Sequence, residues 1–519
     1  MTEAADLLLV NAEVHSLVGA DGNTDGDADE TFEALAVRDG QIVRLGSTYD
    51  VEFLAGSETE VVDLDGRVVL PGFVDAHVHL SMTGRYLVHA NLSGVSRAGE
   101  AVDRLRERAD EVGSDEWVQG YGYDESTWDE PRYLTREDLD GVSETQPVVA
   151  FREDMHVASL NSVALERCRA GMPDDDVHTE GGEPTGVVVE EAVDPVFEAV
   201  EPDAGEMREL LAAAQRRANE LGTTGVHDMV RHSRAPQVYR EMDLAGDLSL
   251  RVRINYWADH LDALEEAGLR TNHGSEMVRT GAIKSYTDGS FGGRTAKLSE
   301  PYSDDADATG QWVVDPEELG DIVARADDAG FQMTAHAIGD EAIDAVLDAY
   351  SETGNPGEMR HRVEHVELAS DEALERFGEL GVVASVQPNF LKWADEGGLY
   401  ASRLGDRRTQ TNRYPALLDA GAPLAFGSDC MPLDPLLGVH WAVNAPAESQ
   451  RLGVTEALRA YTLGAAYAGF DEERLGTVEV GKCADLTVLE ESPWDHADEI
   501  RDLGVAMTVV DGDAVYDGR

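Results

Sequence analysis

Basic residues are scarce in this chain of 519 residues, which has 41 Lys and Arg against 103 Asp and Glu and a net charge of −62. Binding to a phosphate backbone needs a basic surface, so the deficit excludes nucleic acid as a partner. An acidic surface with little lysine is typical of proteins in molar salt, where the Debye length falls to about 3 Å. We therefore interpret the composition as halophilic adaptation. The only lysines are Lys284, Lys297, Lys392 and Lys482.

Cysteine and long apolar runs are also lacking. The cysteines Cys168, Cys430 and Cys483 are odd in number and far apart, which excludes a disulfide framework and favours a reducing cytoplasm. No apolar run approaches the roughly 18 residues of a membrane span. The acidic start of the chain lacks the basic region of a signal peptide. We therefore expect a cytoplasmic protein that does not bind membranes.

What the chain does have is a regular alternation of short β-rich segments and helical patterns through its middle. Helical patterns follow many of these segments, for example at 316–329 and 341–350. Eight strands that alternate with helices predict an α/β protein with a (β/α)₈ barrel of the TIM type. The predicted strands are 73–80, 223–229, 250–257, 281–287, 331–337, 362–367, 382–388 and 423–429.

Both ends of the chain are β-rich, and we expect them to pair into one small sheet domain. The predicted division is 1–72 and 469–519 for this domain and 73–468 for the barrel, with an insertion at about 81–205 that is partly helical and rich in loops. Residues 21–27 begin like a calcium-binding loop, but its twelfth position would be Phe32, where a glutamate is required. We interpret this segment as a solvated acidic loop.

Residues that can bind metal recur near the ends of the predicted barrel strands. His77 and His79 are two apart on one strand and therefore point to the same face. A lone histidine on a strand is more often a hydrogen-bonded core residue. The whole set at the carboxyl ends of one barrel, where active sites lie, instead predicts a hydrolytic metal centre. Its other members are Lys284, His336, His365 and Asp429.

Two of these residues imply a specific chemistry. A desolvated Lys284 would lose its proton, and its neutral amine could add CO₂ to form a carbamate that bridges two metals. The alternative is a buried ammonium paired with Asp288. Asp429 is the predicted base, taking a proton from water whose pKa a metal lowers towards about 7. His156 and Arg294 are candidates for stabilising the oxyanion or gripping substrate, with a plain structural role as the alternative.

The chain resembles the amidohydrolase superfamily, and within it the YtcJ-like, N-substituted formamide deformylase-like (amidohydrolase 3) branch. The motifs that carry the resemblance are LPGFVDAHVH at 70–79, DGSFGGRTA at 288–296, RVEH at 362–365, SVQP at 385–388, GSD at 427–429 and GKCADL at 481–486. The resemblance implies a metal-dependent barrel, a β-sandwich built from both termini and hydrolysis of amide-type C–N bonds.

The resemblance also implies how the ligands are shared. His77 and His79 would bind the more buried metal and His336 and His365 the second, with Lys284 as the carboxylated bridge. Asp429 would be the base and the final ligand. The chain departs from its relatives at Asp154-Met155-His156, where they often have Asp-Gly-His, and at His365-Val366-Glu367, where they have His-Ala-Gln. These changes affect which substrate we expect the chain to accept, and they leave the metal centre intact.

We therefore predict a hydrolase that holds one or two divalent metal ions and cleaves a small amide-type, non-peptide C–N bond. Zinc is expected because the donors are N and O atoms, with manganese and iron as alternatives. The predicted catalytic residues are Asp429 and His156. Aromatic residues and a carboxylate at 120–128 either line the pocket or anchor the insertion. The predicted substrate-binding residues are Arg294, Asp288, Asp124 and Trp128.

Other functions stay open at this point. The same metal centre could hydrolyse an ester or a phosphoester, because the attacking water reaches either a carbonyl carbon or phosphorus. A non-catalytic scaffold of the same fold is the remaining alternative. The expected partner is a small-molecule substrate, and a homodimer is left open.

Overall fold

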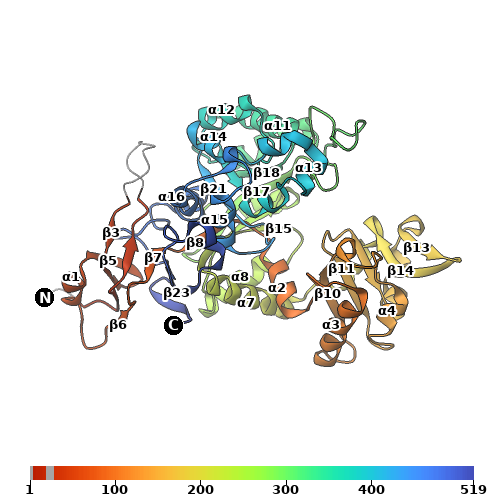
Figure 1. The fold of residues 1–519 in the computed structure, drawn as a ribbon, viewed down its shortest axis with the longest axis horizontal. Helices are drawn as coiled ribbons and strands as arrows, with labels where there is room; N and C mark the ends of the chain where they lie inside the picture. The colour runs from red at the N-terminus through yellow and green to blue at the C-terminus, as the bar shows by residue number, and fades with distance from the viewer. Residues whose placement is uncertain (1–3, 19–28) are drawn as a thin grey trace. The chain divides into compact units, whose positions relative to one another are not determined.

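The computed structural model of the chain describes residues 4–18 and 29–519. The acidic loop predicted at 21–27 lies outside these residues. The described chain divides into two compact units, one formed by residues 1–79 and 215–519 and the other by residues 80–214 (Figure 1). Within the described ranges, no helix combines the length and the apolar character that crossing a membrane requires.

The first unit contains a sheet of eight parallel strands that follow one another in sequence order. The edges of this sheet meet where Asp429 N donates a hydrogen bond of 2.8 Å to His77 O, between the last strand and the first. This nearly closed sheet with its helices confirms the predicted barrel. Its strands are β8 (Phe73–Val78), β15 (Thr223–Val230), β16 (Arg251–Trp257), β17 (Val278–Tyr286), β18 (Met333–Ala337), β19 (Arg362–His365), β20 (Val383–Val386) and β21 (Leu424–Phe426).

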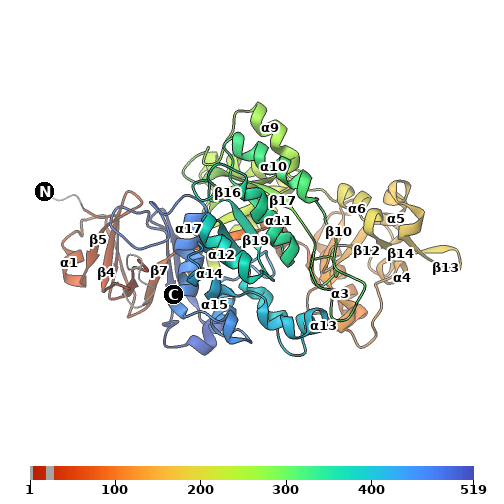
Figure 2. The same ribbon diagram turned by 90° about the horizontal axis from the view of Figure 1, so that it is seen from above.

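The barrel strands are buried along nearly their whole length, as expected when helices cover a parallel sheet. Asp315 caps the N-terminus of helix α10 (Pro316–Asp328), because its side chain accepts hydrogen bonds from the N–H groups of Glu317 and Glu318. Helices α11 (Asp340–Ser351) and α12 (Asp371–Leu380) follow β18 and β19, and α11 lies between α10 and α12 and contacts both (Figure 2). Helix α12 ends at Gly381, whose φ of 64° is the left-handed conformation that glycine adopts readily.

Strands from both ends of the chain share one sheet. Strand β7 (Val68–Pro71) pairs antiparallel with β22 (Leu486–Leu489), in a six-stranded sheet of order β24-β23-β22-β7-β2-β3. The other strands of this sheet are β24 (Asp513–Asp517), β23 (Val505–Val510), β2 (Glu13–His15) and β3 (Thr31–Phe32). A four-stranded sheet completes this part, in the order β5 (Gln41–Gly46), β4 (Ala34–Arg38), β1 (Leu7–Val10) and β6 (Glu60–Asp63). One apolar cluster joins Leu9 and Val69 to Val488 and Met507. The expected pairing of the two β-rich ends is therefore present, whereas the boundaries at residues 72 and 469 stay a prediction.

The second unit, residues 80–214, is richer in strands than the sequence suggested. It holds a six-stranded sheet of order β13-β14-β12-β11-β10-β9, in which β10 (Val118–Tyr123) and β11 (Val148–Arg152) are parallel and β11 and β12 (Val157–Leu160) are antiparallel. The remaining strands are β13 (Val177–Glu180), β14 (Glu183–Val189) and β9 (Ala90–Asn91). Helices including α3 (Ala98–Glu111) and α5 (Ser162–Cys168) pack with it around two apolar clusters. The loop-rich description was wrong, because short strands separated by polar turns carry a weak pattern.

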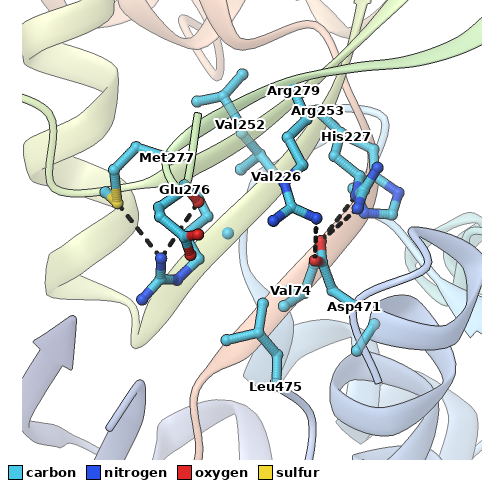
Figure 3. A pocket seen from close by; sticks show the side chains of 13 residues that line it. Val74, Val226, His227, Val252, Arg253, Glu276, Met277, Arg279, Asp471 and Leu475 are labelled. Atoms are coloured by element: carbon cyan, nitrogen blue, oxygen red, sulfur yellow. Dashed lines mark hydrogen bonds and ion pairs between the residues drawn. The ribbon is translucent and has the colours of Figure 1, made fainter. Parts of the chain in front are cut away.

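A cluster of paired charges lies at the amino-terminal ends of the barrel strands. Arg253 Nη2 is 2.7 Å from Asp471 Oδ2, and Figure 3 shows these two side chains meeting beside a small pocket. Arg251 Nε is likewise 2.7 Å from Asp485 Oδ2. These ion pairs attach the segment that follows the barrel to the start of β16.

Candidate metal centre

The predicted ligands come together at the carboxyl ends of the barrel strands. The ring centroids of His77 and His79 are 5.7 Å apart, and those of His77 and His365 are 5.0 Å apart. The ring of His336 is 4.5 Å from that of His365. The structure thus gathers in one place four histidines that lie far apart in the sequence.

Three of these side chains form a group with the geometry of a metal site. His77 Nε2 is 3.6 Å and His79 Nε2 is 3.5 Å from Asp429 Oδ1. The three candidate ligand atoms all lie within 4.8 Å of one another. Two imidazole nitrogens and a carboxylate oxygen are a donor set that suits zinc and its neighbours.

Hydrogen bonds turn the histidine rings so that one nitrogen of each is left for a metal. His77 Nδ1 donates to Glu364 Oε2 at 2.7 Å and His79 Nδ1 donates to Met229 O at 3.1 Å, so both Nε2 atoms face Asp429. In His336 the two ring nitrogens have the opposite roles, because Nε2 donates to Gly289 O at 2.9 Å. Its Nδ1 is buried and, among the described residues, has no hydrogen-bond partner. A buried nitrogen lone pair of this kind fits a metal ligand.

Lys284 lies in β17 with only 1% of its surface exposed, and its Nζ has no hydrogen-bond partner in the described part of the chain. Burial lowers the pKa of Lys284 to about 8, although Glu364 and Asp429 favour the charged form. The rings of Tyr286 and Trp257 lie 5.4 and 5.9 Å from Nζ. These surroundings suit the neutral amine that carbamate formation requires.

The alternative ion pair between Lys284 and Asp288 is not what the structure shows. The Asp288 carboxylate accepts hydrogen bonds from three backbone N–H groups at 2.8–3.0 Å, those of Lys297, Ile338 and Gly339. Asp288 is fully buried, and burial raises its pKa to about 7. These contacts tie the segment after β17 to the end of β18, and they favour a structural role for Asp288 over the predicted contact with substrate.

The backbone leaves the barrel through tight turns at two of the ligands. The φ angles of His365 and Val366 are 76° and 50°, and those of Asp429 and Cys430 are 54° and 56°. Residues other than glycine rarely adopt this left-handed region, and each costs about 1–3 kcal/mol unless its surroundings hold it. Strain of this kind collects at functional sites, and here it falls on two predicted ligands, His365 in β19 and Asp429 after β21.

Close contact between the first and last strands sets the position of Asp429. A Cβ on Gly427 would lie 2.5 Å from His77 N, so only glycine allows β21 to approach β8 this closely. Asp75 Oδ1 accepts from Ser428 N at 2.9 Å and from His77 N at 3.1 Å. Asp75 is fully buried, and burial raises its pKa to about 7.

Asp75 and Glu364 are the contributors to the site that the sequence reading missed. For Asp75 the spacing offered a signal, because it alternates with His77 and His79 along one strand and shares a face with them. Glu364 lies in the RVEH motif beside His365, but its contact with His77 spans 287 positions of sequence. No local pattern reveals a partner so distant.

Arg294 is already engaged by another side chain. Its Nη2 is 2.8 Å from Asp304 Oδ2, and the same oxygen is 2.5 Å from Arg403 Nη1. This arrangement holds the segment after β17 against α13 (Leu399–Leu404). A role for Arg294 in binding substrate stays a prediction.

The remaining predicted residues belong to the second unit. His156 is exposed, and its Nδ1 is 3.1 Å from Glu190 Oε2. Asp124 accepts from Ser126 N at 3.1 Å, and Trp128 is 5% exposed in an apolar cluster. The burial of Trp128 supports the alternative in which it anchors residues 80–214. The functional roles of His156 and Asp124 rest on the sequence alone.

Comparisons with known proteins agree with this arrangement. A family model described as "Amidohydrolase family" matches residues 60–516. "Putative amidohydrolase YtcJ" of Bacillus subtilis is 34% identical, over 93% of this chain and 96% of that protein. "N-substituted formamide deformylase" of Arthrobacter pascens is 27% identical, over 100% and 99%. The crystal structure of an uncharacterized metal-dependent hydrolase from Pyrococcus furiosus has a TM-score of 0.81 and 30% identity, over 94% and 99%.

Proposed function

From the premise that the chain belongs to the amidohydrolase family, we propose that it hydrolyses a small amide-type, non-peptide C–N bond at the centre described above. The observation that carries this proposal is the meeting of His77, His79 and Asp429 within 4.8 Å at the carboxyl end of the barrel. Membership of the family makes the chain a hydrolase. The bond that it cleaves, the metal and the mechanism are what we propose.

The donors fit two divalent ions, and we expect zinc, with manganese and iron as alternatives. His77, His79 and Asp429 would hold one ion, and His336 and His365 would hold the other. Lys284, as a carbamate, would supply an oxygen to each. When bound, such ions polarise a carbonyl group and lower the pKa of bound water from 15.7 to about 7.

The chain's own residues supply the proton transfers. Asp429 is the expected general base: its side chain is 19% exposed, so its carboxylate is accessible, and Asp429 N–H is fixed by His77 O. The carboxylate would take a proton from the attacking water and return it to the leaving nitrogen. The barrel interior beneath it is tightly packed and excludes bulk water from the buried faces of His77, Glu364 and Lys284.

Two observations support an amide-type bond over an ester or a phosphoester. One relative is named N-substituted formamide deformylase and covers the chain from end to end. Once the Asp429 carboxylate has taken a proton from water, the resulting carboxylic acid can also protonate a departing amine, which leaves poorly as an anion.

The test is a substrate screen with purified protein in molar salt, run beside metal analysis. Formamides, N-acyl amino acids and lactones would be offered to the wild type and to Asp429→Asn. We expect turnover of at least one C–N substrate that the variant loses. Turnover of lactones alone, at the same centre, would assign the ester alternative instead.

A further inference from the structure

We propose that Glu364 is the positioning residue that orients His77 for metal binding, and that Arg362 and Thr334 hold Glu364 in place. This inference rests on the proposed metal centre, but it concerns side chains inside the barrel that are not themselves ligands. Neither the family match nor the names of the relatives assign a role to Glu364, Arg362 or Thr334.

The contact with His77 determines which ring nitrogen is available. Glu364 Oε2 lies 2.7 Å from His77 Nδ1, and both side chains are almost completely buried, at 0% and 1% exposed. A carboxylate accepts hydrogen bonds and does not donate, so His77 Nδ1 must carry the proton. In a neutral imidazole the lone pair is then on Nε2, the atom that faces Asp429. Glu364 therefore selects the tautomer that a metal needs and fixes the plane of the ring.

The second oxygen of Glu364 is held by the protein. Glu364 Oε1 accepts from the hydroxyl of Thr334, and it lies 2.7 Å from Arg362 Nη2. A buried carboxylate without a counter-charge is unstable, and Arg362 supplies that charge within the barrel. With Oε1 occupied by these two groups, Oε2 is left to His77 alone.

Arg362 is in turn fixed by three other strands. Its Nη2 donates to Ala76 O at 2.5 Å and to Ser385 Oγ at 2.9 Å, and its Nη1 donates to His227 Nδ1 at 2.9 Å. These partners belong to β8, β20 and β15. The planar fork of a guanidinium reaches several acceptors at once, which the point charge of a lysine cannot do. Because Ala76 precedes His77, Arg362 fixes the backbone of the ligand as well as its carboxylate partner.

His79 provides an internal contrast. Its Nδ1 donates to a backbone carbonyl, that of Met229, which no substitution of a side chain removes. A change at Glu364 should therefore release His77 and leave the ring of His79 oriented. We therefore predict that the fixed ring orientation is lost at His77 and kept at His79.

The first measurement uses metal-free wild-type protein with ¹⁵N-labelled histidine. The NMR signal of His77 is assigned by its absence in His77→Gln. We expect the Nδ1–H tautomer in the wild type and loss of that single tautomer in Glu364→Gln. A wild-type His77 with its proton on Nε2 would overturn the proposal, whether or not the variant folds.

The second measurement is the zinc dissociation constant, obtained by competition with a chelator. We expect Glu364→Gln to bind zinc about 10–100-fold more weakly, the usual effect of removing a hydrogen-bond partner of a metal ligand. Ser385→Ala is the matched control, because it removes one contact of Arg362 and leaves the pair between Glu364 and His77. Unchanged affinity in Glu364→Gln, or an equal loss in Ser385→Ala, would refute the proposal.

A failure of this inference can be distinguished from a failure of the proposed function. If His77 and His79 did not bind metal at all, replacing both would leave the zinc content unchanged, and the proposed centre would be wrong. The tautomer of His77 in metal-free protein would still report whether Glu364 orients the ring.

Discussion

Replacement of Asp471 by asparagine should strongly destabilise the barrel while leaving the metal centre intact. Asp471 is the shared partner of three arginines at the amino-terminal ends of the strands. Arg253 Nη2 is 2.7 Å away, Arg279 Nη1 is 3.1 Å away and Arg474 Nη1 is 3.4 Å away. Asparagine keeps the shape of the side chain but removes its charge.

The size of the effect follows from burial. The side chains of Arg253 and Asp471 are only 6% and 11% exposed. Burial lowers the pKa of Arg253, and Asp471 is the group that opposes this shift most. Removal of one partner of a buried pair leaves an uncompensated charge and typically costs about 3–5 kcal/mol. An exposed pair contributes about 0–1 kcal/mol, and Arg217–Glu220, at 46% exposure on both sides, is such a pair.

The assay is urea unfolding of wild type, Asp471→Asn and the control Glu220→Gln, each in molar salt. Salt screens exposed charges far more than buried ones, so the loss in Asp471→Asn should persist while Glu220→Gln stays near wild type. If the two variants unfolded at the same urea concentration, the buried ion pairs of Asp471 shown in Figure 3 would not contribute to the free energy of unfolding, which would contradict the prediction.

Three further outcomes are expected. Asp429→Asn should fold normally and lose turnover by about 10²–10⁴-fold, measured on the best substrate, and near-normal turnover would place the base elsewhere. Lys284→Ala should lose activity that acetate or propionate with added metal partly restores, because either carboxylate supplies bridging oxygens; no rescue would contradict the carbamate. Burial lowers the pKa of His15, but Asp29 and Glu13 raise it by more, above the ordinary value of 6.5. The resulting stabilisation is complete below about pH 6.5 and is lost as pH rises through the folded pKa, so His15→Gln should flatten this alkaline loss in unfolding curves recorded across pH.

The barrel could be predicted from the sequence because the patterns that identify its strands are local. All eight predicted strands overlap the strands of the structure, since each is a short apolar run followed by turn residues. The candidate ligands were identifiable for the same reason: His77, Lys284, His336 and His365 lie within the last residues of their strands. A barrel brings such positions together whatever the loops do.

The parts that could not be predicted depend on distant partners. Asp75 is bound to Ser428 across 353 positions, and Glu364 to His77 across 287. Asp288 lies four residues beyond Lys284, which suggested an ion pair. However, β17 ends at Tyr286, and the Asp288 carboxylate accepts hydrogen bonds from the N–H groups of Ile338 and Gly339, which follow β18. Periodicity does not specify such contacts.

In the proposed centre, His77 and His79 bind metal at the mouth of the barrel. The most direct test is the metal content per chain of purified wild type and of the double variant His77→Gln/His79→Gln, measured by inductively coupled plasma mass spectrometry. Circular dichroism would confirm that both proteins are folded. We expect one or two transition-metal ions per chain in the wild type and the loss of at least one in the double variant. Equal metal content in the two folded proteins would contradict this assignment.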